Sequence, residues 1–344
     1  MATKTLATKY RPTTFDEVTE QSSIKTILQQ EIATGTTKNA YLFTGGAGTG
    51  KTTCARIFAN ELNNGKGNPI EMDAASNSGV DDVREIIQQA QTKSLTSEYK
   101  VFIIDECHSI SNTGWQAFLK LIEEPPAKSV FIFCTTDPQK IPKTIISRVE
   151  RYDFQRISLD GIVDRLQYII RCENEEISDK SVDIHYQIES IEMIAKMADG
   201  GMRDAITLLD KCVSYSNNLT EENVINALGT TDYGTMFDIT NSFFNKDCST
   251  LIEKIESVHE SGKDLKQFVR TFMTFMLDIN KYRHTKSFRY IQIPSIYKDE
   301  LDTYGDYEYD TCERLLSVLI KLNADVKWDT SPKSLIEATL ITEV

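Results

Sequence analysis

The stretch from Tyr41 to Thr53 constrains the fold of this chain more than any other. It reads YLFTGGAGTGKTT and fits the pattern G-x-x-x-x-G-K-[ST], with Gly45, Gly50, Lys51 and Thr52 at the fixed positions. A backbone that wraps around a phosphate needs N–H groups that point inward, and glycine reaches the required φ and ψ angles without a Cβ clash. We expect such conformations at Gly45, Gly46, Gly48 and Gly50. The stretch therefore predicts a buried strand, a phosphate-binding loop and the start of a helix.

The predicted helix adds the other parts of an anion site. Because it begins near Lys51, its unpaired N–H groups and its positive dipole end face the loop. Lys51 can reach the β- and γ-phosphates of a nucleotide, and Thr52 can reach a bound Mg²⁺. The alternative is an ordinary glycine-rich turn. The strand before the loop and the helix after it, Thr52 to Leu62, argue against that alternative.

A second apolar run ends in two acidic residues. The segment from Lys100 to Ile104 is followed by Asp105 and Glu106, which is typical of a central parallel strand with a functional carboxyl end. Asp105 is placed for a metal contact across from Thr52. Glu106 can orient or deprotonate an attacking water. His108, two residues on, is interpreted as structural.

Two later positions are candidates for the same site. The run from Ser129 to Thr136 reads as a buried strand with a polar end, where Thr136 can hold the water or the γ-phosphate, or merely begin a turn. A Gly-Gly pair at 200–201 precedes Arg203 at a helix start, which suits a small helical lid whose arginine swings onto the nucleotide. The alternative is an arginine paired with a nearby aspartate.

The segment before the phosphate loop is open to two interpretations. It reads KYRPTTFDEV and contains Tyr10, Arg11 and Pro12. An aromatic residue and a proline just upstream of a nucleotide loop can pack on a base. They can equally belong to an N-terminal arm that closes the core, and composition does not separate the two.

The periodicity of apolar residues divides the chain into three regions. Strands alternate with helices as far as Arg156, which predicts a parallel, doubly wound α/β domain over 1–157. From Ser158 the pattern is helical, and we expect a small helical lid over 158–229 and a helical collar over 230–344. Apolar residues in excess of the collar's own core would mark a subunit contact.

Two segments of the collar have their own signals. The segment 285–310, with many tyrosines and aspartates, looks irregular. The last helix is expected to begin at Pro332 and to be capped by Thr330 and Ser331.

Bulk composition limits the partners and the compartment. The chain has 344 residues, of which 40% are hydrophobic and 26% charged, as in ordinary globular proteins of two or three domains. Its net charge of −13 means that DNA contact requires a local basic patch or helix N-termini. The seven cysteines form no C-x-x-C pair, which argues against a zinc site or a disulfide framework. No secretory or membrane-spanning segment is visible, so we expect a cytoplasmic protein that does not contact a membrane.

Taken together, the motifs resemble those of a known family, the ATPase subunits of DNA polymerase clamp loaders within the AAA+ class, most closely the bacterial gamma/tau type. The resemblance is carried, in chain order, by KYRPTTFDEV, GGAGTGKTT, EMDAASNSGVDDVREI, VFIIDECHSIS, FLKLIEEPP, TTDPQKIPKTIISR and GGMRDAITLLDK. The terminal helices match only weakly.

The resemblance implies roles within the nucleotide site. Asp105 and Glu106 would form the Walker B pair, with Mg²⁺ bound by Thr52 and Asp105. Thr136 would be sensor 1, and Arg203 would be sensor 2 on the lid. The residues implied to hold ATP are Gly45, Gly46, Ala47, Gly48, Thr49, Gly50, Lys51, Thr52 and Thr53, with Tyr10, Arg11 and Pro12 near the adenine.

The resemblance also implies partners. Arg148 lies in the motif that family members write Ser-Arg-Cys, and such an arginine reaches the ATP of a neighbouring subunit. Arg84 would face the DNA backbone. The family opens a ring-shaped sliding clamp and places it on primer-template DNA, so the implied partners are other loader subunits in a pentamer, the clamp and the DNA. The rivals are a non-hydrolysing scaffold subunit and an AAA+ DNA motor such as a branch-migration helicase.

Three departures from the family pattern stand out. The bacterial family carries a four-cysteine zinc module after the first helix, whereas here Asn63 to Asn68 bridges directly, so no zinc is predicted. Val149 replaces the usual cysteine after Arg148. Glu20 stands where the family usually has glycine.

Overall fold

The chain folds into two compact units. The computed structural model describes residues 4–77, 79–92, 97–176, 183–228, 233–262, 264–305 and 309–344. The first unit comprises residues 1–184 and 194–214, and the second comprises residues 185–193 and 215–344. The three domains expected from the sequence remain a prediction, and their boundary at 229–230 lies outside the described residues.

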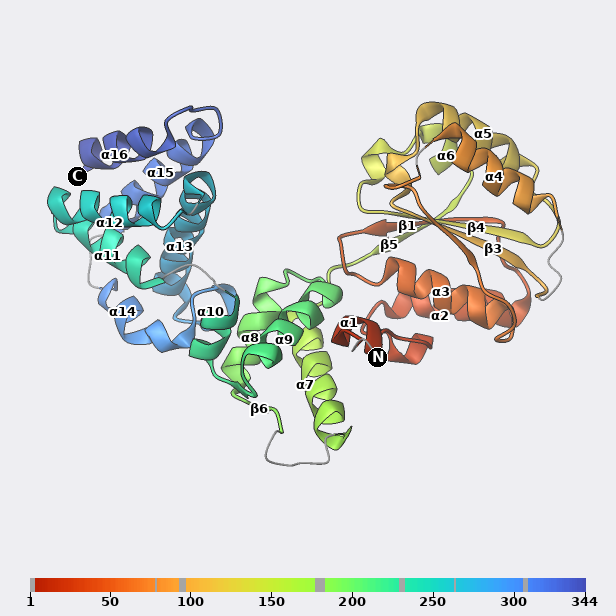
Figure 1. The fold of residues 1–344 in the computed structure, drawn as a ribbon, viewed down its shortest axis with the longest axis horizontal. Coiled ribbons are helices and arrows are strands. Elements are labelled where there is room, and N and C mark those ends of the chain that lie inside the picture. The colour runs from red at the N-terminus through yellow and green to blue at the C-terminus, as the bar shows by residue number, and fades with distance from the viewer. Residues whose placement is uncertain are drawn as a thin grey trace. The chain divides into compact units, whose positions relative to one another are not determined.

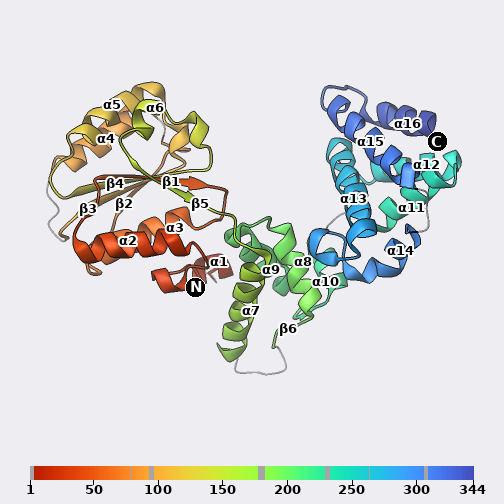
Figure 2. The ribbon, with the colours of Figure 1, turned by 180° about the vertical axis from the view of Figure 1, so that it is seen from behind.

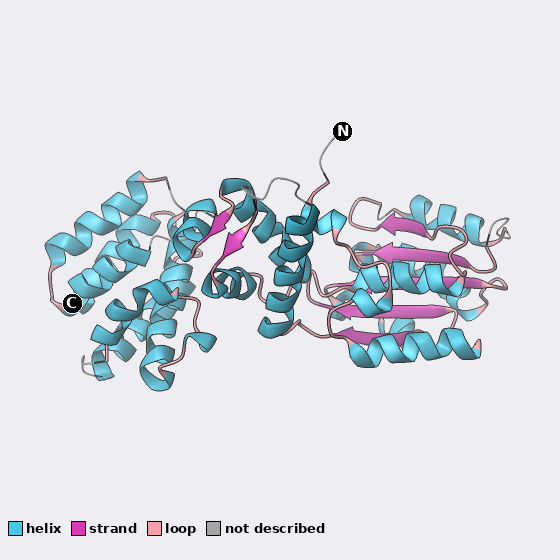
Figure 3. Ribbon diagram, turned by 90° about the horizontal axis from the view of Figure 1, so that it is seen from below, coloured by secondary structure: helices cyan, strands magenta, loops and turns pink. Residues whose placement is uncertain are grey.

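A parallel five-stranded sheet forms the centre of the first unit (Figure 1). Its strands are β1 (Ala40–Gly45), β2 (Ile70–Asp73), β3 (Lys100–Asp105), β4 (Ser129–Thr135) and β5 (Glu150–Phe154). Their order is β2-β3-β4-β1-β5, and every neighbouring pair is parallel, so the strand arrows share one direction (Figure 3). The strands β1, β3 and β4 are those predicted individually from the sequence, and the predicted alternation of strands and helices extends over all five. The order places the carboxyl ends of β1 and β3 on either side of β4.

Helices cover both faces of this sheet (Figures 1 and 2). One face carries α2 (Ser22–Thr34) and α3 (Lys51–Leu62), and the other carries α4 (Val80–Ala90), α5 (Asn112–Glu123) and α6 (Lys143–Ile146). Successive residues of a strand point to opposite faces, so Phe43 packs in one core cluster and Leu42 in the other. Because both faces are covered, the central strands carry unbroken apolar runs, residues 101–104 in β3 and residues 130–134 in β4.

The N-terminal segment of the first unit packs against the helices that follow the sheet. It contains α1 (Leu6–Lys9) and the 3-10 helix η1 (Phe15–Glu17), and the later helices are α7 (Leu159–Glu176) and α9 (Met202–Tyr215). The backbone N–H of Leu6 donates to Asp210 Oδ2 at 3.1 Å, and Arg165 donates to Tyr10 O at 3.0 Å. The helix α8 (Ile188–Met197) contributes residues to both units.

The second unit contains two short strands that the sequence reading missed. It expected this region to be helical, but β6 (His185–Tyr186) pairs in parallel with β7 (Asn218–Leu219). Two-residue strands are too short to show alternation of apolar and polar residues. The helices are α10 (Glu221–Leu228), α11 (Tyr233–Phe244), α12 (Cys248–Glu260), α13 (Leu265–Thr285), α14 (Lys298–Thr303), α15 (Tyr309–Asp325) and α16 (Pro332–Glu343).

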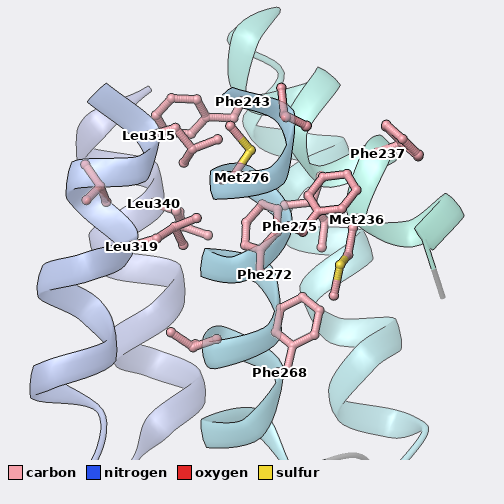
Figure 4. Packing of buried hydrophobic residues seen from close by; sticks show 14 of the residues in the cluster. Met236, Phe237, Phe243, Phe268, Phe272, Phe275, Met276, Leu315, Leu319 and Leu340 are labelled. Carbon is pink, nitrogen blue, oxygen red and sulfur yellow. The ribbon is translucent and has the colours of Figure 1, made fainter. Parts of the chain in front are cut away.

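The long helix α13 runs through the core of the second unit. Figure 4 shows Phe268, Phe272 and Phe275 on this helix packed among side chains of the neighbouring helices. Its Met276 is fully buried in the same cluster, as are Leu319 and Leu340 on α15 and α16. The bundle of helices expected at the end of the chain is therefore present.

Two details of the second unit differ from expectation. The segment after α13 is not wholly irregular, because it contains α14 and the 3-10 helices η5 (Phe288–Tyr290) and η6 (Ser295–Tyr297). The helix α16 begins at Pro332 as expected, but the side chain of Ser331 makes no capping hydrogen bond. Asp329 Oδ1 instead accepts from the backbone N–H of Ser331 at 2.6 Å.

Among the helices that the structure describes, none has the length and the apolar composition that a membrane span requires.

Candidate active site

Most of the predicted site residues of the first unit line one cavity of about 270 Å³ at the carboxyl ends of β1 and β3. Gly45 and Gly46 of the phosphate loop do not line it, and neither do Arg84 and Arg148. The sequence-predicted residues that line the cavity are Tyr10, Arg11, Pro12, Ala47, Gly48, Thr49, Gly50, Lys51, Thr52, Thr53, Asp105, Glu106, Thr136 and Arg203. Residues from seven separate stretches of the first unit thus converge on one site, among them Val18 and Ile157.

The phosphate loop has the expected backbone at three of its four glycines. Gly45 has a φ of 144°, and a Cβ there would collide with the backbone of Phe154 on β5. Gly48 and Gly50 also have positive φ angles, 69° and 103°. The prediction for Gly46 is wrong: its φ is not positive, and a Cβ there would meet only Thr49 Cγ2 at 3.6 Å. Gly46 is therefore not required by backbone conformation.

Lys51 lies at the first position of α3 with its side chain folded into the loop. Its Nζ donates to Gly45 O at 2.9 Å and to Gly46 O at 2.7 Å. The residue is 6% exposed, and burial lowers the pKa of its ammonium group. A phosphate that binds Lys51 would supply an acceptor of opposite charge in place of these neutral carbonyl groups.

Thr52 and Asp105 meet across the loop. Thr52 Oγ1 donates to Asp105 Oδ2 at 2.8 Å, although the two residues are 53 positions apart. This pairs a hydroxyl with a carboxylate at the cavity wall, and oxygen ligands of this kind suit Mg²⁺, which commonly takes one or two carboxylates together with substrate phosphates. The described residues contain no cluster of three or more His, Cys, Asp or Glu side chains arranged for a metal. The prediction that zinc is absent remains a prediction.

Glu106 follows β3 in an unusual backbone conformation, with φ 45° and ψ 41°. Its Oε2 accepts a hydrogen bond from Thr136 Oγ1 at 3.1 Å. The parallel pairing of β3 and β4 brings these two residues together, because each follows the carboxyl end of its strand. His108 lies beside the same carboxylate, with Nδ1 3.3 Å from Glu106 Oε2. The sequence reading gave His108 only a structural role.

The lid contacts the phosphate loop directly. The backbone N–H of Met202, at the start of α9, donates to Gly48 O at 3.0 Å. Gly201 lies so close that a Cβ on Gly48 would be 3.0 Å from its Cα. Arg203 follows at the cavity wall. Among the described residues, Arg203 forms no ion pair with Asp204 or Asp210, which was the alternative to a lid arginine.

The N-terminal segment also lines the cavity, together with a residue that was not predicted from the sequence. Arg165 of α7 lines the cavity and donates to Tyr10 O at 3.0 Å. Burial raises the pKa of the Tyr10 hydroxyl. No motif in the sequence marks Arg165, because its place depends on how α7 packs against the N-terminal segment.

The two predicted arginines outside the phosphate loop and lid, Arg148 and Arg84, do not line the cavity. Arg148 Nε donates to Glu123 Oε1 at 2.8 Å, and its Nη1 donates to Thr144 O at 2.9 Å. Its side chain is 40% exposed. Arg84 is paired with Asp81 at 2.9 Å on the exposed surface of α4. Neither arginine lines the cavity of its own chain, and their roles toward a neighbouring subunit and DNA remain predictions.

Three family models match the chain in order. "DNA polymerase III, delta subunit" matches residues 70–158, and "DNA polymerase III clamp loader subunit, ATPase lid domain" matches residues 161–218. "DNA polymerase III subunits gamma and tau domain III" matches residues 219–342. The three matches cover successive regions, so they describe one arrangement of domains and do not compete for the same residues.

Curated relatives agree with these models. DNA polymerase III subunit tau of Bacillus subtilis is 31% identical over 99% of this chain and 63% of its own length. DNA polymerase III subunit gamma/tau of Mycobacterium tuberculosis is 32% identical over 79% of this chain and 50% of its own length. The tau subunit of Escherichia coli is 33% identical over 67% of this chain and 38% of its own length. The chain thus spans less than two thirds of the length of these relatives.

Solved structures agree with the fold. The RuvB Holliday junction branch migration motor of Thermotoga maritima matches with a TM-score of 0.51 over 68% of this chain and 78% of that chain, at 19% identity. Such a likeness shows the fold alone. The family models and the curated relatives go further, and by them the chain belongs to the clamp-loader subunits of the AAA+ class, of the DNA polymerase III gamma/tau type.

Proposed function

We propose that this chain is an ATP-hydrolysing subunit of a DNA polymerase clamp loader, which uses ATP binding and hydrolysis to open a sliding clamp and load it on primer-template DNA. The observation that carries the proposal is the convergence of Lys51, the Thr52–Asp105 pair and the Glu106–Thr136 pair on one cavity. A triphosphate, a divalent cation and an attacking water each find a matching side chain there.

ATP would lie with its phosphates along the loop from Gly45 to Thr53 and its adenine near Tyr10, Arg11 and Pro12. The N–H groups of the loop, the N-terminus of α3 and Lys51 would all favour the phosphates. The arm that carries Tyr10 also contacts Arg165 of α7, so a base bound there would touch both the arm and the lid helices.

In the hydrolysis step, the oxygen of a water would bond to the γ-phosphorus. The bond from the γ-phosphorus to the bridging oxygen of ADP would break, and the water proton would pass to Glu106. Thr136 would hold the water or the γ-phosphate. Thr52 and Asp105 would hold Mg²⁺, which neutralises charge on the phosphates when bound.

Arg148 is proposed to act on the nucleotide of a neighbouring subunit, and Arg84 on the DNA backbone. Arg148 lies outside its own cavity and is partly exposed, which fits a residue that acts in trans. An arginine supplied in trans is worth about 10³- to 10⁵-fold in rate in related NTPases, or roughly 4–7 kcal/mol. An isolated chain should therefore hydrolyse ATP very slowly. The assembly, a pentamer with other loader subunits, should be stimulated by the clamp and primed DNA.

The test is ATP turnover by the full chain with its partner subunits, measured with and without a sliding clamp and primed DNA. Stimulation by both, and its loss in Lys51→Ala, would support the proposal. Tight ATP binding without turnover would indicate a scaffold subunit instead. Strand displacement that does not need a clamp would indicate a DNA motor.

A further inference from the structure

His108 lies beside Glu106, although the proposed function assigns it no role. It belongs to the 3-10 helix η2 (Cys107–Ser109), which directly follows β3 and Glu106. Its Nδ1 lies 3.3 Å from Glu106 Oε2 and 3.1 Å from Thr135 Oγ1, at the end of β4. The side chain is 20% exposed, so the ring is largely enclosed. The imidazole therefore links the ends of two neighbouring strands to the carboxylate that follows one of them.

The partners of Nδ1 indicate which ring nitrogen carries a proton. An ionised carboxylate only accepts hydrogen bonds. Thr135 Oγ1 already accepts one from the backbone N–H of Asp137 at 3.0 Å and has a second lone pair for another donor. A protonated Nδ1 is a donor that suits both Glu106 and Thr135. An unprotonated Nδ1 would place its lone pair next to the lone pairs of the carboxylate, which is repulsive. The tautomer with a proton on Nδ1 is therefore the one that suits the carboxylate, and a role for His108 as a donor to Glu106 requires that tautomer.

Neighbouring side chains orient the carboxylate of Glu106. The backbone of Glu106 is left-handed, with φ 45°, which residues other than glycine rarely adopt, and such conformations concentrate at functional sites. Thr136 Oγ1, from the end of β4, donates a hydrogen bond to Oε2, and His108 Nδ1, from η2, lies 3.3 Å from the same oxygen. If Thr136 turns to a water or a phosphate, as its proposed role requires, His108 remains to hold Oε2.

We infer that His108 is a positioning residue for ATP hydrolysis, whose Nδ1–H holds Glu106 Oε2 while the carboxylate receives the proton of the attacking water. The inference rests on the proposed ATPase function. The effect should fall on turnover and not on ATP affinity, because Lys51 and the loop hold the phosphates. A carboxylate displaced by about an ångström can lose roughly 100-fold in rate.

The test compares three substitutions in the full loader assembly with clamp and primed DNA. His108→Ala removes the donor. His108→Asn places an amide nitrogen at the position of Nδ1, one bond beyond Cγ, and His108→Gln places its amide further out. We expect kcat to fall roughly 10- to 100-fold in His108→Ala and His108→Gln. In His108→Asn it should return to within about threefold of the wild type, and the Kd for ATP should stay within about twofold in all three.

A double-mutant cycle with Glu106→Gln separates positioning from general disruption of the site. If His108 acts only through Glu106, adding His108→Ala to Glu106→Gln should leave the residual turnover unchanged. Full additivity, unchanged kcat in His108→Ala, or equal loss in the Asn and Gln variants would overturn the inference. Because Asn and Gln are both polar amides, their comparison stays decisive even where His108→Ala folds poorly. A wild-type assembly without turnover would instead overturn the proposed function, and this inference with it.

Discussion

The contact between the lid and the phosphate loop makes Gly48→Ala a quantitative test of how this site closes. At φ 69° the backbone of Gly48 is left-handed, which costs about 1–2 kcal/mol for a residue with a Cβ. The new Cβ would lie 3.0 Å from Gly201 Cα and 3.3 Å from the backbone nitrogen of Arg203. Backbone cannot turn aside as a side chain can. The lid would have to lift by a few tenths of an ångström.

That movement would weaken the hydrogen bond from the Met202 N–H to Gly48 O, which measures 3.0 Å. Such a bond is worth about 0.5–1.5 kcal/mol. The total penalty on the conformation in which the lid rests on the loop is therefore about 1.5–3.5 kcal/mol. If ATP binding needs this conformation, affinity should fall roughly 10- to 300-fold. A titration of the full chain with a fluorescent ATP analogue, or calorimetry, measures this loss.

The same loop offers a matched control in Gly46→Ala. Its Cβ would meet only Thr49 Cγ2 at an ordinary 3.6 Å, and its φ is not positive. We expect an affinity change of less than about threefold, corresponding to about 0.5 kcal/mol. Combining Gly48→Ala with Arg203→Ala should cost less than the sum of the single changes, since both act through the lid. Equal ATP affinities for the Gly46→Ala and Gly48→Ala variants would refute the claim that the contact between Gly48 and the lid takes part in ATP binding.

Further substitutions test other parts of the site. Lys51→Ala should weaken ATP binding by about 3 kcal/mol, or roughly 100-fold, as measured by calorimetry; binding within threefold of wild type would contradict the assignment. Arg148→Ala should keep ATP affinity but lose roughly 10³-fold in stimulated turnover. Glu123→Gln should lose less, about tenfold, because only the partner of Arg148 Nε changes; unchanged stimulated rates in either variant would contradict the trans role. The free energy of unfolding of Glu20→Gly should exceed that of Glu20→Ala by about 1 kcal/mol, as measured by thermal unfolding, because φ is 56° at this position. The reverse order would show that backbone strain does not set the relative stability of the two variants.

The parts of this protein that the sequence predicted well are set by local physics. Alternating strands and helices follow from apolar periodicity, and the phosphate loop follows from glycines that need positive φ. Asp105 and Glu106 could be placed at a strand end because the apolar run before them stops there. Even so, Gly46 shows a limit. A glycine in a glycine-rich motif is not by itself evidence of a special backbone angle.

The parts that were missed depend on which segments lie side by side. The position of His108 at the site depends on its contact with Thr135. Thr135 is 27 positions away and becomes a neighbour only because β3 pairs with β4. Arg165 reaches Tyr10 across 155 positions. The spacing of residues within each segment does not predict these two contacts. A single sequence without its strand order therefore identifies the motif residues of a site but not the residues that orient them.

Glu20 lies between these two cases. The family usually has glycine at this position, and the observed φ of 56° gives the reason, because glycine adopts a left-handed backbone without cost. The sequence could not show what glutamate adds. Its carboxylate accepts hydrogen bonds from the backbone N–H and the hydroxyl of Ser158, just before α7. The departure from glycine thus exchanges some backbone strain for a bond between the N-terminal segment and the lid helix.

Two of the hydrogen bonds described above join the lid helices to residues that line the cavity. Arg165 on α7 bonds to the arm at Tyr10, where the adenine is proposed to lie, and Met202 on α9 bonds to the phosphate loop at Gly48. A ligand shifts a conformation only through contacts that differ between the two states. On the proposed function Arg203 would contact the nucleotide, and ADP retains the base but lacks the γ-phosphate. We therefore expect hydrolysis to weaken the lid's contact with the ligand at α9 more than at α7, where the base would remain beside the arm.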